Sequence, residues 1–168
     1  MPIPTTNATD ELPAVNQILA SVGQAPVTTL DQTNPDVAIV YDTLLQVSKE
    51  VQAEGWTFNK EFGYKLSPNS DDEFVIANNI LQIDLTDDYQ DKDSVKRGGK
   101  LYERVNHTFK WTDSADYEFD IVWWFDWIDL PIPIQDYIVT KAATIAAQRI
   151  VGDPQLIASL QQRELLSR

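Results

Sequence analysis

Apolar residues recur at helical spacing in two segments near the start of the chain. The first segment lies between Asp10, a residue type that caps helices, and Gly23, which favours the left-handed turn that ends them. The second follows Asn34-Pro35, a cap with proline in the first helical turn, and stops at Gly55. The pattern therefore predicts helices over residues 10–22 and 35–54. Residues 1–9, rich in proline and threonine, are expected to form a loose tail because they offer little to bury.

The last part of the chain predicts two more helices. Pro131 and Pro133 open a helical stripe that Gly152 ends, and much of it consists of small residues: Ala142, Ala143, Ala146 and Ala147. Small side chains let a neighbouring helix approach closely, so this helix is expected to be buried. Asp153-Pro154 repeats the pairing of a cap and a proline, which predicts a final helix over residues 155–166.

Between these helices the apolar pattern changes to that of strands. Aromatic and β-branched residues become frequent, and turn-forming residues separate them. Gly98-Gly99 permits positive φ in a tight turn, and residues 112–115 suit a hairpin loop between the last two strands. The candidate strands span residues 56–59, 63–67, 74–77, 79–85, 100–111 and 116–127.

These elements predict an α+β fold. Its helical body comprises residues 10–55 and 132–168, with two helices from each end of the chain. A β subdomain over about residues 56–130, expected to be one antiparallel sheet, is inserted between them. The length of 168 residues suits one domain.

Charge and composition exclude several classes of function. The formal net charge is −13, so the chain should repel nucleic acid unless it carries a basic patch. The absence of cysteine excludes disulfides, thiolate zinc sites and a cysteine nucleophile. No apolar run approaches the roughly 20 residues that span a bilayer, and the first residues lack a signal-peptide pattern. We therefore expect a soluble chain without a membrane partner.

Two features invite a metal-binding or catalytic interpretation. An acidic run suggests calcium, but it lacks the central glycine and closing glutamate of an EF-hand, so we interpret it as a solvated loop: Asp84, Asp87, Asp88, Asp91 and Asp93. His107 is the only histidine, and a histidine-based site usually needs a second well-placed partner. We interpret it as an ordinary strand residue.

Carboxylates beside tryptophans provide one enzymatic alternative. Asp116, Glu118 and Asp120 precede a tryptophan cluster, Trp123, Trp124 and Trp127, and glycoside hydrolases use paired carboxylates. The same stretch, interpreted as a strand, places bulky apolar groups on both faces, which predicts burial by the core or by a partner chain. We favour core and interface, and keep a carbohydrate-binding or carbohydrate-degrading domain as the alternative.

The densest basic cluster comprises Lys96, Arg97, Lys100 and Arg104. Such a cluster could contact phosphates. In a chain of net charge −13, four cations are only weak evidence for nucleic-acid binding. Salt bridges between subunits, or a contact to an acidic neighbouring copy, are the favoured interpretation.

Four segments, in order along residues 10 to 152, resemble one protein family. They are Ala14-Val15-Asn16-x-Ile18-Leu19-Ala20-Ser21-x-Gly23-x-x-Pro26-Val27-x-x-Leu30, Gly55-Trp56-Thr57-Phe58-Asn59, Arg97-Gly98-Gly99-x-x-Tyr102-x-Arg104 and Leu130-Pro131-x-x-x-x-x-Tyr137-Ile138-Val139-Thr140-Lys141-Ala142. The family is tail tubular protein A, the ring-shaped adaptor of short-tailed bacteriophages (podoviruses). None of these segments is a catalytic motif, and each alone would match many proteins. The resemblance is specific because all four occur in the order found in the family.

The resemblance implies a structural virion protein of the phage tail, made in the host cytoplasm, and not an enzyme. It implies one adaptor domain over residues 1–168 that assembles as a twelve-fold homo-oligomeric ring. In the family this ring joins the portal protein to a nozzle built from tail tubular protein B, and tail fibres dock where ring and nozzle meet. Genomic DNA passes through the channel without sequence-specific binding, and no cofactor or metal is required. A head-completion protein of another tailed-phage type is the second possibility within this class.

The matched positions supply most of the candidate interface residues. The resemblance implies that they shape the β domain or its contacts: Trp56, Phe58, Arg97, Gly98, Gly99, Tyr102 and Arg104. The strand pattern adds Trp124 and Trp127. Family members continue into a longer C-terminal extension that grips the portal, whereas the sequence here stops at Arg168. We therefore expect a portal-clasping element that is shorter or is built from residues 154–168.

Overall fold

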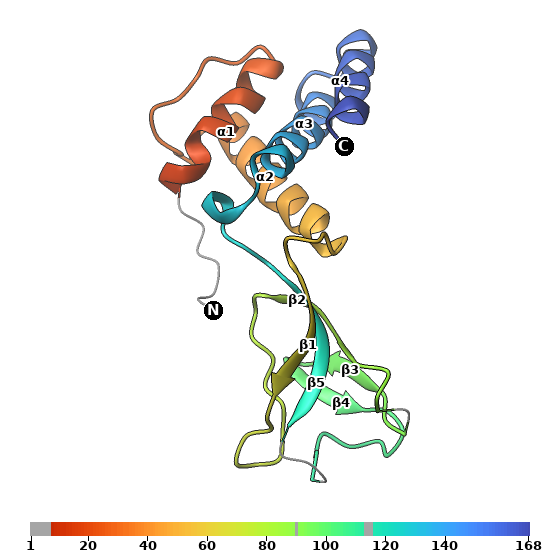
Figure 1. The fold of residues 1–168 in the computed structure, drawn as a ribbon. Coiled ribbons are helices and arrows are strands. Elements are labelled where there is room, and N and C mark those ends of the chain that lie inside the picture. The colour runs from red at the N-terminus through yellow and green to blue at the C-terminus, as the bar shows by residue number, and fades with distance from the viewer. Residues whose placement is uncertain (1–7, 90, 113–115) are drawn as a thin grey trace. The chain divides into compact units, whose positions relative to one another are not determined.

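Two compact units make up the described part of the chain. The structure is a computed structural model that describes residues 8–89, 91–112 and 116–168 (Figure 1). The first unit, here called the β unit, is Gln52–Phe125. The second, the helical unit, comprises residues 8–51 together with Asp126–Arg168. The chain therefore crosses between the units twice, and the predicted α+β fold class is confirmed.

Four helices occur among the described residues: α1 (Ala8–Ser21), α2 (Pro35–Ala53), α3 (Ile132–Ile150) and α4 (Pro154–Ser167). Each lies where the apolar period predicted it, but Asp10 lies inside α1, so its prediction as the cap of this helix is wrong. The Asp153 carboxylate accepts the backbone N–H of Gln155 at 2.9 Å and so caps α4 as expected. Residues 8 and 9 belong to α1, so the predicted tail is wrong for them, and residues 1–7 lie outside the described residues.

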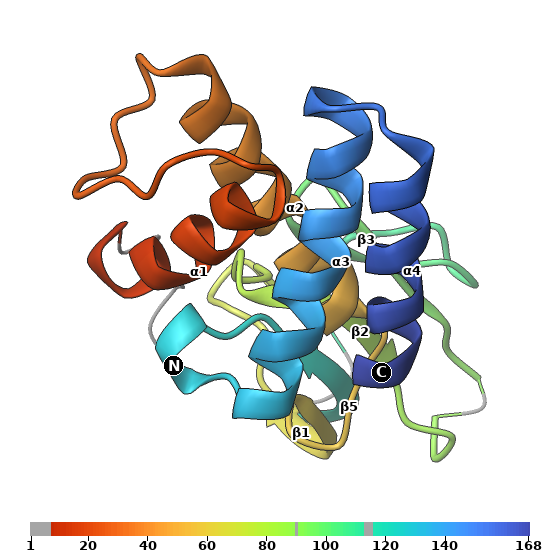
Figure 2. The ribbon, with the colours of Figure 1, turned by 90° about the horizontal axis from the view of Figure 1, so that it is seen from above.

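The helical unit is built around α3. Its alanines Ala142, Ala143, Ala146 and Ala147 are all buried, which confirms the prediction from their size. α1 and α4 both pack against this helix, and Figure 2 shows α3 and α4 side by side. The absence of long side chains at these positions of α3 allows this close packing.

The β unit contains two small antiparallel sheets. β1 (Lys60–Leu66), β5 (Tyr117–Trp123) and β2 (Ile80–Leu85) form a three-stranded sheet in the order β1-β5-β2. β3 (Ser94–Arg97) and β4 (Lys100–Glu103) form a separate hairpin. The prediction of one sheet is therefore wrong, and β3 was not predicted. β3 has only four residues, and its polar side chains offer no apolar alternation.

Several predicted strands are shorter than expected or absent. Residues 56–59 form a turn, and residues 74–77 contribute only an isolated bridge between Val75 and Lys100. The strand predicted at 100–111 ends at Glu103, and β4 pairs with β3 instead of forming the predicted hairpin with β5. Of the loop assigned to that hairpin, residues 113–115 lie outside the described residues.

The strand predicted at 116–127 ends at Trp123. The 3-10 helix η1 (Trp127–Asp129) follows it, so Trp124 and Trp127 are not strand residues and the alternation assigned to them is wrong. The cause lies in the hydrogen bonds of Phe125, whose backbone N–H and C=O both bind the side chain of Gln52 in place of a neighbouring strand.

Aromatic rings fill the core of the β unit. Phe74 makes edge-to-face contacts with Trp111, Tyr117 and Phe119, at ring-centroid distances of 5.4, 5.8 and 5.4 Å. Tyr117 and Phe119 project from one face of the central strand β5. Buried aromatic pairs in this geometry stabilise a core beyond the area they bury, so this cluster defines the inner face of the sheet.

Two buried amide side chains, here called the amide clamp, join the beginning and the end of the β unit. Gln52 is 0% exposed; its Oε1 accepts the N–H of Phe125 at 2.8 Å and its Nε2 donates to the carbonyl of Phe125 at 3.2 Å. Asn59 is 1% exposed, and its Nδ2 donates to the carbonyls of Gln52 and Trp123, both at 2.8 Å. Its Oδ1 accepts the N–H of Trp56 at 2.8 Å.

We predict that Gln52→Met destabilises the β unit by about 2 to 5 kcal/mol, because two backbone groups of Phe125 lose their partners in a buried place. Urea denaturation followed by tryptophan fluorescence measures this. Gln82→Met is the matched control: Gln82 is exposed and donates one hydrogen bond, to the carbonyl of Ala53. The control should change stability by less than about 0.5 kcal/mol. Equal effects of the two substitutions would contradict the role of the clamp.

Candidate interaction surface

The hairpin of β3 and β4 turns through Gly98 and Gly99. Both have positive φ, 57° and 77°, a region that L side chains rarely adopt. This confirms the tight turn predicted there. The turn places Arg97 opposite Lys100 and Val95 opposite Tyr102 in the ladder. Side chains two residues apart share a face of a strand, so Lys100 and Tyr102 lie on one face while Leu101 points into the core.

An arginine and two aromatic rings are stacked on the outer face of this hairpin. The guanidinium of Arg97 lies 4.2 Å from the ring centroid of Tyr102, and that ring lies 4.9 Å from Phe109. Val75 and Val105 are 67% and 57% exposed. We call these five residues the hairpin surface. Arginine, tyrosine and phenylalanine are among the residues enriched at protein interfaces.

Positive charge is concentrated around the hairpin. Residues 94–110 contain five lysines and arginines and one glutamate, a net charge of +4; because the whole chain carries −13, the rest carries −17. Three of the cations have carboxylate partners: Lys100 and Lys110 with Glu73, and Arg104 with Asp93. Lys96 donates to the carbonyl of Ile80.

Arg97 differs from the other four cations. Among the residues that the structure describes, its only recorded partner is the ring of Tyr102, and it faces another cation, Lys100, across the ladder. Lys100 is already paired with Glu73, whereas no carboxylate partner of Arg97 is recorded among these residues. The guanidinium of Arg97 is therefore available to bind an external carboxylate.

Glu103 is buried beneath the hairpin, with 2% exposure, and shapes the loop that follows. Its carboxylate accepts the N–H groups of Val105 and Asn106, both at 2.7 Å. Burial alone would raise the pKa of Glu103, but these N–H groups outweigh it and hold the pKa below its ordinary value of 4.5. These hydrogen bonds fold residues 104–107 into a turn, in which His107 is exposed and has a positive φ of 55°. The prediction of His107 as a strand residue is therefore wrong.

A small pocket opens beside Arg97. Its volume is about 280 Å³. Three basic residues line it, together with one ring, one apolar side chain and one carboxylate: Arg97, Arg104, His107, Tyr102, Val105 and Asp93. Because Asp93 already pairs with Arg104 at 2.8 Å, the charge left unpaired in the lining is that of Arg97.

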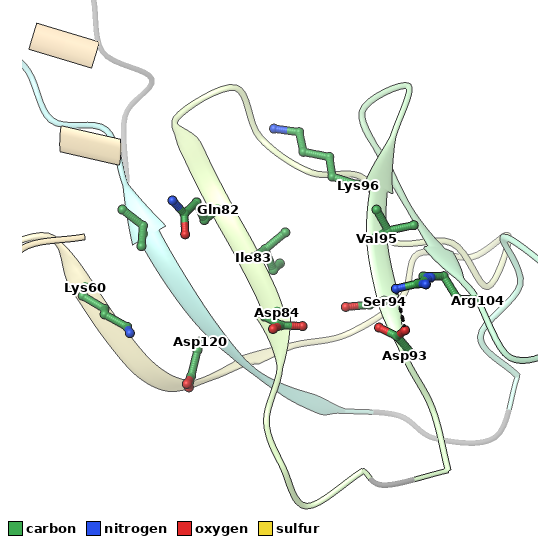
Figure 3. A pocket seen from close by; sticks show the side chains of 11 residues that line it. Lys60, Gln82, Ile83, Asp84, Asp93, Ser94, Val95, Lys96, Arg104 and Asp120 are labelled. Atoms are coloured by element: carbon green, nitrogen blue, oxygen red, sulfur yellow. Dashed lines mark ion pairs between the residues drawn. The ribbon is translucent and has the colours of Figure 1, made fainter. Parts of the chain in front are cut away.

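A second, larger pocket of about 450 Å³ lies between the outer face of the three-stranded sheet and β3 (Figure 3). Gln82 and Asp84 extend from β2, and the ion pair of Asp93 with Arg104 borders the side near β3. Asp84 stands opposite Asp120 in the ladder of β2 and β5. No aromatic side chain is among the described residues that line this pocket.

The carboxylates of the carbohydrate alternative are engaged elsewhere. Asp116 accepts a hydrogen bond from Ser67, Glu118 pairs with Lys65 at 3.4 Å, and Asp120 accepts the N–H of Gly63 at 3.2 Å. The Trp123 indole packs edge-to-face on Tyr64 within the core and donates to Glu61 at 3.0 Å. The structure therefore does not place the buried indole of Trp123 beside these carboxylates in a sugar-binding groove.

The predicted interface residues separate into two groups. Arg97, Gly98, Gly99, Tyr102 and Arg104 are together on the hairpin or directly after it. The others lie away from it in the sequence: Trp56, Phe58, Trp124 and Trp127. Sequence reasoning missed the exposed apolar residues of the hairpin surface, since their neighbours are known only from the fold.

The ring of Phe58 lies 6.2 Å from that of Phe125, next to the amide clamp. Within the described ranges no three histidines, aspartates or glutamates are grouped as a metal site would need. None of the helices described is long and apolar enough to cross a membrane.

A family model described as Tail tubular protein matches residues 12–168, so the chain belongs to the tail tubular protein family, as the sequence resemblance predicted. A search of curated proteins found no match. Membership in this family gives the chain a structural role in a bacteriophage tail.

We predict that Glu103→Gln destabilises the β unit by about 1 to 3 kcal/mol at pH 7, because a charged acceptor of buried N–H groups becomes neutral. Since the folded-state pKa lies below 4.5, the carboxylate contributes its full stability above pH 4.5 and loses it as pH falls through that lower pKa. The difference between wild type and variant should therefore narrow below pH 4.5.

Urea denaturation at several pH values measures this difference. Glu118→Gln is the control, because it removes only a partly exposed ion pair and should cost less than about 1 kcal/mol. A gap between wild type and Glu103→Gln that stays constant from neutral to strongly acidic pH would contradict the argument.

Proposed function

We propose that this chain is the subunit of an adaptor ring that joins the portal protein to the tail nozzle. The observation that carries the proposal is the family match over residues 12–168, which covers both the helical unit and the β unit. Both units together form the single adaptor domain, and the ring is a homo-oligomer of twelve copies, as in the adaptors that the sequence resembles.

A ring subunit functions through the shape and charge of its surfaces. Each copy in a closed ring must present two different, complementary faces to its neighbours. The separation of a net charge of +4 on residues 94–110 from −17 on the rest supports such a design, because opposite charges select the right partner face. No reactive group and no cofactor is required for this role.

The surplus of negative charge also suits a channel for DNA. An acidic wall repels the phosphate backbone, and a narrow tube strengthens the field, so genomic DNA slides through without sequence-specific binding. The nozzle protein, tail tubular protein B, lies below the ring, and tail fibres dock at the ring's lower edge. A ring with a neutral or basic lumen would rule out this part of the proposal.

We predict that a phage whose gene for this chain is disrupted assembles heads but fails to attach nozzle and fibres. Electron microscopy of the particles and mass spectrometry of their proteins measure this outcome. Supplying the wild-type chain from a plasmid should restore complete tails. Complete tails in particles that lack this chain would contradict the adaptor role.

The structural role and the carbohydrate alternative predict opposite outcomes in an enzyme assay, and we expect the outcome of the structural role. The purified chain should release no product from polysaccharide or peptidoglycan, because the carboxylates considered for that activity are bonded to their own neighbours. Measurable hydrolysis that disappears in Asp116→Asn or Glu118→Gln would replace the structural role with an enzymatic one.

A further inference from the structure

We propose that the hairpin surface of one copy binds the acidic turn at residues 86–89 of a second copy, with Asp87 and Asp88 directed at Arg97. The proposal rests on the proposed ring, for which it identifies one contact between subunits. It assigns a basic face and an acidic face to each copy of the chain. The chemistry is that of a guanidinium that binds carboxylates above an aromatic platform.

The basic side of the contact is already shaped for a carboxylate. Stacking on Tyr102 holds the guanidinium of Arg97 in place, so little side-chain freedom is lost when it binds. The exposed His107 also lines the pocket of about 280 Å³ beside it. Arginine binds carboxylates through two parallel hydrogen bonds, which adds geometric selectivity to the charge attraction.

The turn at residues 86–89 presents two carboxylates on a fixed support. The N–H of Thr86 donates to the carbonyl of Glu118 at 3.1 Å, and the N–H of Tyr89 closes the turn on the carbonyl of Thr86 at 3.2 Å. The ring of Tyr89 packs against Tyr117 at 5.1 Å. Both ends of the turn are therefore attached to β5.

Asp87 and Asp88 lie at the tip of this support. Asp87 and Asp88 are both exposed, and no ion pair of either is recorded within the described residues. A second acidic turn of the β unit, at Asp71 and Asp72, is already next to a cation, because Lys110 donates to the carbonyl of Asp71. The 86–89 turn is thus the better match for an unpaired guanidinium.

The two sides of this contact lie on different parts of the same chain. A contact between unlike surfaces is heterologous, so each copy can bind one neighbour on each side. Such a contact builds a ring or an open chain of copies, and it does not stop at a two-fold dimer. Head-to-tail growth is the geometry that the proposed ring needs.

Charge reversal tests the contact directly. Arg97→Glu should weaken self-association by about 10- to 100-fold, because like charges then meet in the contact. The double variant Asp87→Lys with Asp88→Lys should weaken it by a similar factor. None of these side chains belongs to the core, so both proteins should melt like the wild type. Mass photometry and sedimentation velocity over a range of concentrations measure the association.

Mixing the two variants is the decisive step. Each junction in an alternating assembly joins the introduced glutamate to the two introduced lysines, or the original Arg97 to the original aspartates, so the mixture should associate as the wild type does. Arg163→Glu is the matched control, since Arg163 is an exposed cation on α4 outside the hairpin and has no recorded partner in the part of the chain described. It should leave association unchanged.

Three results would overturn the inference. One is association of Arg97→Glu at the wild-type strength, and another is a mixture that associates no better than its separate components. The third is a wild-type chain that stays monomeric, or stops at a dimer, at every concentration. None of these results tests the chain's role in the tail, which the gene disruption tests separately. A failure of this contact can therefore be distinguished from a failure of the proposed function.

Discussion

The β unit depends on two buried amide side chains at its entrance and exit. Gln52 binds both backbone groups of Phe125, and Asn59 binds the carbonyls of Gln52 and Trp123. Without them, backbone groups at the end of the central strand would be buried without hydrogen-bond partners, and each such group lowers the free energy of unfolding by about 1 to 3 kcal/mol. The clamp thereby sets where β5 ends, and through β5 it sets the positions of both neighbouring strands of the sheet.

That support gives the surface of the β unit a defined shape. The aromatic core around Phe74 packs on β5, and the carbonyl of Phe74 accepts the N–H of Leu101, which attaches the hairpin to the same core. Glu103, buried below, orders the loop that carries Val105. A platform of arginine and aromatic rings held in this way loses little side-chain entropy on binding a partner, which suits the proposed role as a ring subunit.

Local patterns predicted the helices well and the strands only in part. The apolar period, the prolines and the caps at Asn34 and Asp153 identified the four described helices, and the alanines of α3 predicted its burial, because these signals act within a few residues along the chain. The turn at Gly98 and Gly99 was predicted for the same reason. The ends of the strands were not, since they are set by side chains that bind distant backbone groups, as Gln52 does for Phe125. Within the candidate site, the sequence predicted Arg97 and Tyr102. It did not predict Phe109 and Glu103, because their roles depend on packing between segments, which the spacing of apolar residues does not show.

The central claim is that this chain acts through assembly, as repeated copies in the phage tail. A cryo-EM map of the tail, at a resolution that identifies side chains, tests it most directly. The account predicts a closed ring of this chain between portal and nozzle, in which the Arg97 side chain of each copy meets an acidic surface of the next. A map in which that position is occupied by another protein, or in which copies of this chain do not contact one another, would contradict it.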